Sequence, residues 1–360
     1  MTKQQTYSAP GRVCLYGEHQ DYLKLTVVPA AINLKTKITV EKNNTREIRV
    51  NSVELGKNHS FKITKNLSLA KNEFDYIRAV LMVLFQENII EEISGFNLNI
   101  TSQIPIGSGL SSSAAILVAW LTALNDQLNL RLNKTEIADL CFIAENKILG
   151  INCGIMDQYS SSLGGIFSLD CDGPPYKIQQ FTTELNGLVI GDSCIRRSAN
   201  EPLTLLKSQI TTGIEKIKQQ GNFELRTLAS NTLTEFRDFI TEDEYRKLLG
   251  VITIRNITKR SITELSKNEE QDFEYLGSLL TKQQTMLRDY LGVSIPELDN
   301  LIDVSLKAGA LGAKLTGAGL GGCIIALAPG KEEEVASAIN SAGGKAIICK
   351  IDFDGAKKED

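Results

Sequence analysis

The chain has 360 residues, of which 42% are hydrophobic and 23% are charged, and its formal net charge is -4 at pH 7. This composition is that of an ordinary globular protein, and it excludes a collagen-like, low-complexity or disordered chain. The small negative charge and the lack of a Lys/Arg block give no indication of a nucleic-acid-binding surface.

The cysteines, histidines and apolar runs exclude further classes. Seven cysteines are scattered without a C-x-x-C pair, and with only two histidines there is no zinc-ligand spacing. The N-terminus lacks a signal-peptide core, and the longest apolar run, residues 114–124, is too short to span a bilayer. We expect a cytoplasmic protein with free thiols and no membrane or nucleic-acid partner. The sequence leaves the oligomeric state open, with a monomer as the default.

The first half of the chain mixes strand and helix patterns. Apolar residues alternate over 32–40 and 96–100, which predicts two half-buried strands. Between them, residues 74–85 have helical periodicity, and residues 114–124, apolar almost all round, predict a buried helix. Three further elements are expected, an amphipathic helix and two short strands, over 135–149, 166–169 and 188–190.

The second half of the chain differs in composition and in the spacing of its apolar residues. From about 201 to 290 the chain is polar with a long period, which predicts several helices. A strand, a helix and a strand follow, over 322–327, 332–339 and 346–351. Because strands and helices mix without a regular βαβ alternation, we predict an α+β fold in two lobes, with domains over 1–195 and 196–360.

Residues 107–115 (GSGLSSSAA) combine glycines and hydroxyls between a predicted strand and a predicted helix. Glycines let the backbone approach a ligand closely, and the N–H groups at a helix start favour an anion. The segment lacks the Lys of a P-loop and is not the dinucleotide fingerprint. A phosphate cradle is the favoured interpretation, and a Ser-rich N-cap turn is the alternative. The candidate phosphate-binding residues are Gly107, Ser108, Gly109, Ser111, Ser112 and Ser113.

Glu18, His19 and Asp21 lie within four residues of one another, in otherwise apolar surroundings. Such a cluster can hydrogen-bond several hydroxyls of a sugar or polyol, although a solvated turn would have the same composition. A second glycine-rich segment, residues 315–323 (LTGAGLGGC), precedes a predicted strand. Alone it could be a tightly packed strand entry, but two such segments suggest a ligand held from both lobes.

Two carboxylates stand beside apolar residues. Asp157 follows Ile155 and Met156, and Glu145 lies at the edge of the apolar stripe of the predicted helix over 135–149. Both are candidates for a partly dry site. Salt bridges or helix-surface solvation are the alternatives for each.

These segments, in this order, resemble the GHMP small-molecule kinases, and within them the galactokinase-like branch. The matching motifs are residues 10–22, 105–114, 153–158 and 316–323, with a further galactokinase-like stretch at 294–301. The resemblance spans nearly the whole chain. It implies a two-lobed GHMP kinase fold, with an N-terminal lobe like ribosomal protein S5 domain 2 and a ferredoxin-like C-terminal lobe. ATP phosphates would lie on residues 107–115, and a sugar between the lobes.

The resemblance also implies roles for single residues. Asp157 matches the catalytic base and Arg12 its charge-stabilising neighbour. Glu145 and a loop hydroxyl, taken as Ser112, match the Mg²⁺ ligands. The implied sugar contacts are Glu18, His19, Asp21 and the backbone of Gly154. The implied adenine-side residues are Phe74 and Tyr76.

The chain departs from the galactokinase pattern near the implied sugar site. Cys14 stands where the family motif has Asn, and residues 23–25 (LKL) replace a common Asn-Gly-Gly turn. The stretch 195–202 offers no sugar-contacting Tyr, so Glu201 or Asn200 is expected in its place.

The implied activity is ATP- and Mg²⁺-dependent phosphorylation of the anomeric hydroxyl of galactose or a related monosaccharide. One alternative is a mevalonate-type kinase of the same superfamily, which the sugar-type segment 153–158 disfavours. Another is a sensor that binds ATP and sugar without turnover. The intact segment 111–115, together with Glu145 and Asp157, disfavours the sensor.

Overall fold

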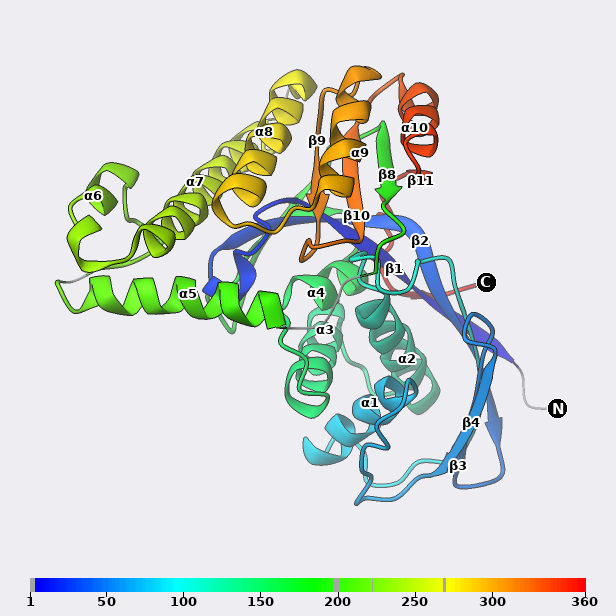
Figure 1. The fold of residues 1–360 in the computed structure, drawn as a ribbon. Helices are drawn as coiled ribbons and strands as arrows, with labels where there is room; N and C mark the ends of the chain where they lie inside the picture. Colours follow the sequence, from blue (N-terminus) through cyan, green and yellow to red (C-terminus); the bar gives the residue numbers. More distant parts are fainter. Residues whose placement is uncertain (1–3, 197–200, 222, 268–269) are drawn as a thin grey trace.

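The computed structural model describes residues 4–196, 201–221, 223–267 and 270–360, and contains two β-sheets flanked by helices (Figure 1). The α+β class is thereby confirmed. The larger sheet has the strand order β12-β1-β2-β5-β3-β4, with β6 paired to β2 and β7 to β6. Its strands are β1 (Gln5–Tyr16), β2 (Thr26–Asn43), β3 (Glu47–Ser52), β4 (Lys57–Lys62), β5 (Gly95–Ser102), β6 (Ile166–Asp170), β7 (Lys177–Phe181) and β12 (Lys357–Lys358).

Helices cover one face of this larger sheet, as Figure 1 shows. They are α1 (Asp75–Gln86), α2 (Ser112–Leu128), α3 (Lys134–Phe142) and α4 (Met156–Leu163). The core between sheet and helices is apolar, with Trp120 fully buried and its indole N–H donating to the carbonyl of Ile77 at 3.2 Å. The helix predicted over 135–149 is formed by α3 and a π-helical turn, η2 (Ile143–Ile148), that follows it directly.

The smaller sheet is antiparallel, in the order β11-β8-β10-β9. Its strands are β8 (Leu188–Asp192), β9 (Gly312–Thr316), β10 (Cys323–Leu327) and β11 (Lys345–Cys349). The polar region is helical, as predicted. Its helices, with those beside the smaller sheet, are α5 (Glu201–Lys218), α6 (Ser230–Thr234), η3 (Arg237–Phe239), α7 (Glu242–Leu265), α8 (Phe273–Thr285), η4 (Met286–Tyr290), α9 (Pro296–Lys307) and α10 (Glu332–Ser341).

The two sheets do not divide the chain at residue 195. β8 precedes that position but pairs with β10 and β11, and β12 at the end of the chain returns to pair with β1. Residues 188–192 thus belong to the second sheet. The division into domains over 1–195 and 196–360 stays a prediction.

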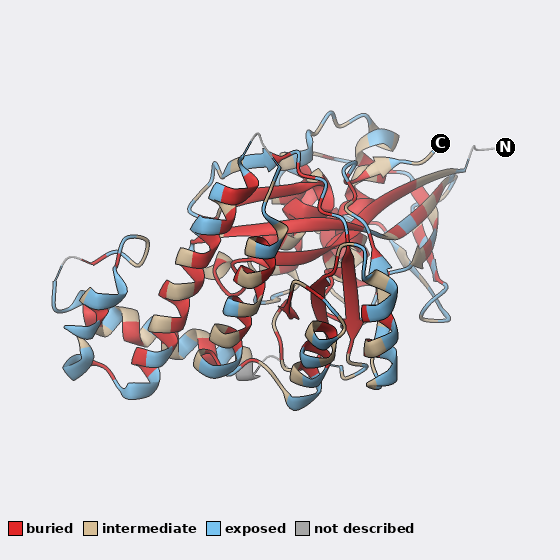
Figure 2. Ribbon diagram, turned by 90° about the horizontal axis from the view of Figure 1, so that it is seen from above, coloured by how far each residue is buried: buried red, intermediate tan, exposed pale blue. Residues whose placement is uncertain are grey.

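Buried residues occupy the strands of both sheets and the inner faces of the helices that cover them. Figure 2 shows buried strands at the centre and exposed outer helix faces. The backbone N–H of Cys14 in β1 donates to the hydroxyl of Thr316 in β9 at 3.0 Å, which joins the larger sheet to the smaller one. All seven cysteines are free thiols. Within the described ranges, no helix is long and apolar enough to cross a membrane.

Candidate active site

Arg12 and Asp157 form the centre of the site. Arg12 lies in the middle of β1, and Asp157 lies in the first turn of α4. The guanidinium donates from Nε to Oδ1 of Asp157 at 2.8 Å and from Nη2 to Oδ2 at 2.7 Å. Its Nη1 donates to the carbonyl of Gly109. One buried arginine thus connects the expected catalytic carboxylate to the expected phosphate loop.

The Arg12 side chain is 6% exposed and the Asp157 side chain is 23% exposed, so the carboxylate is the more accessible partner. Burial alone would lower the pKa of Arg12, but the charge and hydrogen bonds of Asp157 raise it above the ordinary value. Bidentate pairing fixes the orientation of the carboxylate as well as its distance.

Asp21 and Gly154 lie in direct contact next to this pair. A Cβ atom added to Gly154 would overlap the carboxylate of Asp21, so a larger residue at this position would have to displace that side chain. Burial raises the pKa of Asp21 to about 6, and the charge of Asp157 adds to the effect. Asp21, Gly154 and Asp157, predicted as site residues, are therefore brought together.

Glu18 points to the smaller sheet. Its carboxylate forms a buried ion pair with Lys314 of β9 and accepts from the backbone N–H of Gly317 at 2.8 Å. Gln283 of α8 donates to it as well, at 3.2 Å. Protein groups thus engage both Glu18 oxygens, which the sequence pattern did not predict. The contact of Glu18 with a sugar stays a prediction.

His19 adopts a left-handed backbone conformation, with a φ angle of 60°. Its Nδ1 lies 3.1 Å from the hydroxyl of Tyr22, and the two rings meet edge to face. The residue is mostly buried. His19 therefore fixes the position of Tyr22 on the same turn that carries Asp21.

The glycine- and serine-rich loop ends at the start of α2, as predicted. Ser111 is the N-cap residue with a φ angle of 62°, and no side chain caps the helix. Its Oγ is buried and has no hydrogen-bond partner among the described residues. Ser108 donates to the carbonyl of Pro105 at 2.7 Å, which tightens the loop. Uncapped N–H groups at the start of a 17-residue helix make a site for an anion.

The second glycine-rich segment packs on this loop. A Cβ added to Gly317 would lie 2.8 Å from the carbonyl oxygen of Gly109, and one added to Gly322 would lie 2.5 Å from that of Ser108. Side chains at these positions would push the two backbones apart. The two glycine-rich segments are therefore in direct backbone contact, and a ligand held from both lobes stays a prediction.

Glu145 lies in the π-helical turn η2 and is 4% exposed. Its carboxylate accepts from Nε2 of Gln158 at 2.6 Å. Burial raises its pKa to about 7, a hydrogen bond from Ser113 lowers it in part, and the charge of Asp157 raises it further. Ser113 is thus a hydrogen-bond partner of Glu145, and Ser112 as a Mg²⁺ ligand stays a prediction.

The donor set at Glu145 fits a magnesium ion. A buried carboxylate with a raised pKa is stabilised by a cation, and carboxylate and hydroxyl oxygens are hard ligands. Among the described residues, no group of three or more His, Cys, Asp or Glu side chains could hold a metal. An ion here would have to share its coordination with nucleotide phosphates and water, as Mg²⁺ commonly does.

Phe74 is buried and packs on His59. It is buried at 5% exposure just before α1, and its ring stacks on His59 with centroids 5.3 Å apart. Tyr76, the second residue of α1, lies close enough to Glu145 for the charge of that carboxylate to act on it. Burial, and then this charge, raise the pKa of Tyr76 to about 12. The adenine-side assignment of both residues stays a prediction. Asn200 lies outside the described residues, and so does the side chain of Glu201.

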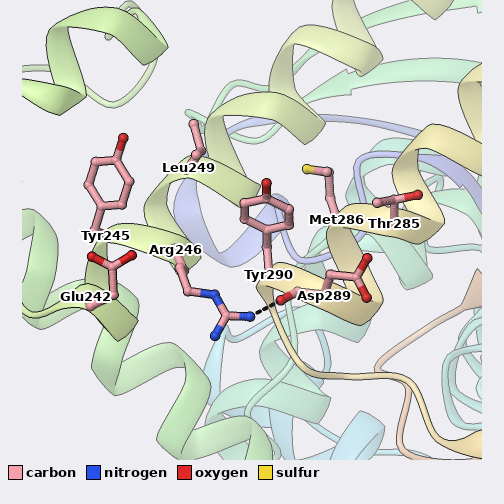
Figure 3. A pocket seen from close by; sticks show the side chains of 8 residues that line it. All are labelled: Glu242, Tyr245, Arg246, Leu249, Thr285, Met286, Asp289 and Tyr290. Atoms are coloured by element: carbon pink, nitrogen blue, oxygen red, sulfur yellow. Dashed lines mark hydrogen bonds between the residues drawn. The ribbon is translucent and has the colours of Figure 1, made fainter.

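A separate cavity of about 440 Å³ lies between α7 and η4 (Figure 3). Its lining includes Tyr245 and Arg246 of α7 and Asp289 and Tyr290 of η4, and Arg246 donates to the carbonyl of Asp289. None of the predicted site residues lines it.

Family models match three stretches of the chain. They are described as the GHMP kinases N terminal domain over residues 75–165, the GHMP kinases C terminal over 262–345, and the galactokinase galactose-binding signature over 2–42. The galactokinase of Thermococcus kodakarensis is 33% identical over 323 residues, which cover 89% of this chain and 88% of the relative. The chain belongs to the GHMP kinase family. It is therefore a small-molecule kinase, a phosphotransferase.

Further comparisons define the branch of this kinase. The mevalonate kinase of Pyrococcus abyssi is 32% identical over 361 residues, or 98% of this chain and 97% of the relative. A crystal structure of Lactococcus lactis galactokinase complexed with galactose matches with a TM-score of 0.88 and 25% identity, covering 99% of this chain and 95% of that one. With the signature over residues 2–42, this likeness places the kinase in the galactokinase-like branch.

Proposed function

We propose that this kinase transfers the γ-phosphate of ATP to the anomeric hydroxyl of galactose or a close relative. The observation that carries the proposal is the position of Arg12, which holds Asp157 on one side and the carbonyl of Gly109 on the other. The carboxylate next to Asp21 and Gly154 is thereby joined to the loop at the start of α2. Acceptor and donor sites would share one buried cation.

In this mechanism Asp157 acts as the general base. It accepts the proton of the anomeric hydroxyl while that oxygen forms a bond to the γ-phosphorus and the bond from phosphorus to the β-bridging oxygen breaks, releasing ADP. The requirements are a base within hydrogen-bond reach and positioned reactants. Arg12 orients the base, and its charge offsets that of the approaching phosphates.

The nucleotide phosphates would lie against the N-terminus of α2, where the uncapped N–H groups face an anion. Ser111 supports this assignment because its buried Oγ is without a partner among the described residues. Glu145 with Ser113 would hold Mg²⁺, and the ion, when bound, would neutralise phosphate charge. Gln158 holds Glu145 in place from the residue after Asp157.

Asp21 and Gly154 are proposed to bind the acceptor. Galactose is favoured because the galactose-binding signature covers residues 2–42, which include the Asp21 turn, and because segment 153–158 agrees with the galactokinase motif. The similarity to mevalonate kinases over nearly the whole chain supports mevalonate as the second candidate acceptor.

A coupled ADP-release assay tests the proposal. Purified kinase with ATP and Mg²⁺ is offered galactose, other aldoses, galacturonate, mevalonate and homoserine. We expect turnover with galactose or a near relative, and a ³¹P spectrum of the product with phosphate on C1. Turnover with mevalonate alone would replace the proposal by the second candidate. Binding of nucleotide and sugar without ADP release would indicate a sensor.

A further inference from the structure

Gln283 of α8 is bonded through both ends of its amide to the acidic turn that follows β1 (residues 17–25). Its Oε1 accepts from the backbone N–H of Gly17 at 3.1 Å, and its Nε2 donates to Oε2 of Glu18 at 3.2 Å. The residue is fully buried and lies 265 positions from Glu18 in the sequence. Because the carbonyl and the NH₂ group of one amide bond to consecutive residues, they fix the orientation of the turn as well as its position.

A second glutamine attaches the same turn to α7. Nε2 of Gln20 donates to the carbonyl of Val251 at 3.2 Å, and Gln20 is fully buried. Within the turn, the N–H of Gln20 donates to the carbonyl of Gly17 at 3.1 Å, so the two attachment points are joined. Both helices contact β1, the strand that leads into the turn (Figure 1). The polar helical region therefore holds the turn through two buried side chains.

The turn needs this support because it carries Asp21 next to another carboxylate. The charge of Asp157 adds to the effect of burial in raising the pKa of Asp21. Since like charges repel, this pair tends to push the turn away from α4. Asp157 is held by Arg12, whereas Asp21 accepts from the N–H of the next residue, Tyr22, at 2.9 Å, which is a bond within the turn. The position of Asp21 against Gly154 therefore depends on how firmly the turn is anchored elsewhere.

Gln284, the next residue of α8, has the same chemistry but different partners. Its Oε1 accepts from the N–H of Leu315 in β9 at 3.0 Å, and its Nε2 donates to Ser294 and to Asp299 at 3.1 Å each. It is 3% exposed. Two neighbouring glutamines are thus equally buried and equally bonded, and Gln283 is the one whose amide bonds to the acidic turn.

We propose that Gln283 is a positioning residue for the acceptor, and that it holds the acidic turn so that Asp21 meets the sugar beside Gly154. The inference rests on the proposed function, and it gives part of the polar helical region a role in acceptor binding. Gln283 acts through the turn and does not touch the sugar itself. Its loss should therefore weaken acceptor binding and spare nucleotide binding, because residues 107–115 are not among its hydrogen-bond partners.

The test compares Gln283→Met and Gln283→Asn with Gln284→Met, by steady-state kinetics with galactose and by calorimetry with ATP and Mg²⁺. Methionine keeps the length of the side chain without the amide, and asparagine keeps an amide that is one methylene too short. We expect Q283M to raise the KM for galactose by about 10-fold, the effect of one lost hydrogen bond to a charged group, and Q283N to raise it by less. In both, kcat should stay within about threefold and ATP affinity within about twofold of wild type, the pattern of lost acceptor binding.

The matched control, Q284M, should keep the galactose KM within about twofold of wild type although it removes as many buried hydrogen bonds. A wild-type galactose KM in Q283M and Q283N would overturn the role of Gln283. An equal rise of KM in Q284M, or an equal loss of ATP affinity in Q283M, would overturn it as well, since either would indicate a general disturbance of the fold. ATP binding reports whether each variant is folded, and Q283N is the milder substitution. A wild-type protein that phosphorylates no sugar would instead overturn the proposed function.

Discussion

Glu18 and Lys314 form a fully buried ion pair, with side chains 2% and 0% exposed, between the turn after β1 and the smaller sheet. They are 296 positions apart in the sequence. The carboxylate also accepts from Gly317 and Gln283, and the ammonium donates to the carbonyl of Leu315 at 2.8 Å. The pair therefore ties the acidic turn to the second glycine-rich segment.

Lys314→Met should destabilise the kinase by about 3–5 kcal/mol, because it leaves Glu18 as a buried charge without its partner. Urea unfolding measures the loss. The matched control is Lys331→Met, since Lys331 pairs with Glu334 at 55% exposure and should change stability by less than about 1 kcal/mol. The double variant Glu18→Gln with Lys314→Met should recover part of the loss. Equal stability of the two lysine variants would show that the buried pair is not needed.

Asp157→Asn should lower kcat by roughly 10²- to 10⁴-fold, the range for a positioned general base, while ATP affinity changes little. Steady-state kinetics with galactose and calorimetry with ATP measure the two effects. Asp238→Asn is the control, because Asp238 is an exposed residue of η3 away from the site. Turnover of D157N at the wild-type rate would remove Asp157 from the mechanism.

Ser113→Ala should raise the Mg²⁺ concentration for half-maximal activity by about 10-fold or more, whereas Ser112→Ala should change it by less than about twofold. The reason is that Ser113 bonds to Glu145 and is proposed to share the ion with it. Mg²⁺ titrations at saturating ATP and sugar distinguish the variants. The reverse order of effects would restore Ser112, the residue chosen from the motif alone.

Glu145 makes stability depend on pH. Its folded-state pKa, about 7, lies above the ordinary value, so its contribution is full below about pH 4 and is lost as pH rises through about 7. Glu145→Gln should therefore be more stable than wild type at pH 8, by on the order of 3 kcal/mol without Mg²⁺. The difference should vanish near pH 4. Urea unfolding at pH 4 and pH 8 measures the stability difference between the variant and wild type at each value. Added Mg²⁺ should stabilise wild type more strongly at pH 8 than at pH 6. An E145Q variant whose stability follows wild type at both pH values would contradict the assignment.

The sequence predicted local elements better than pairings. Helical periodicity over 135–149 correctly placed Glu145 on a helical segment, because the spacing of apolar residues along a short stretch shows which helix face is buried. The strand over 188–190 was found, but five mostly apolar residues do not specify a partner strand, so its place in the second sheet was not predicted. The long strand β1 was missed because Pro10 and Gly11 interrupt its pattern, at the point where its register with β2 shifts.

The site residues show the same contrast between local motifs, which the sequence records, and long-range contacts, which it does not. Asp157, Asp21 and Gly154 were chosen from short motifs; the structure brings them together, and their roles stay predictions. Lys314 contacts Glu18, which lies 296 positions away in the sequence, and a motif does not record such a contact. Ser112 as a metal-binding hydroxyl stays a prediction, because a motif does not distinguish it from its neighbour Ser113.

Lys207 of α5 should influence which sugar is accepted. Its Nζ donates to Oδ1 of Asn152 at 2.7 Å and lies 5.3 Å from the ring centre of Tyr22. Tyr22 follows Asp21, and Asn152 precedes Gly154 by two positions, so this ammonium lies at the edge of the proposed acceptor site. In the described part of the chain, no carboxylate forms a salt bridge with it. A cation in this position favours an acceptor that carries an anion.

We therefore expect Lys207→Met to lower kcat/KM for galacturonate relative to galactose by about 10-fold, the effect of one lost charged contact. Competition between the two sugars in the ADP-release assay measures the ratio directly. Lys218→Met, at an exposed position near the end of the same helix, is the control and should leave the ratio unchanged. The same ratio in K207M and wild type would show that Lys207 contacts only the protein, and that Asp21 and Gly154 select the acceptor without it.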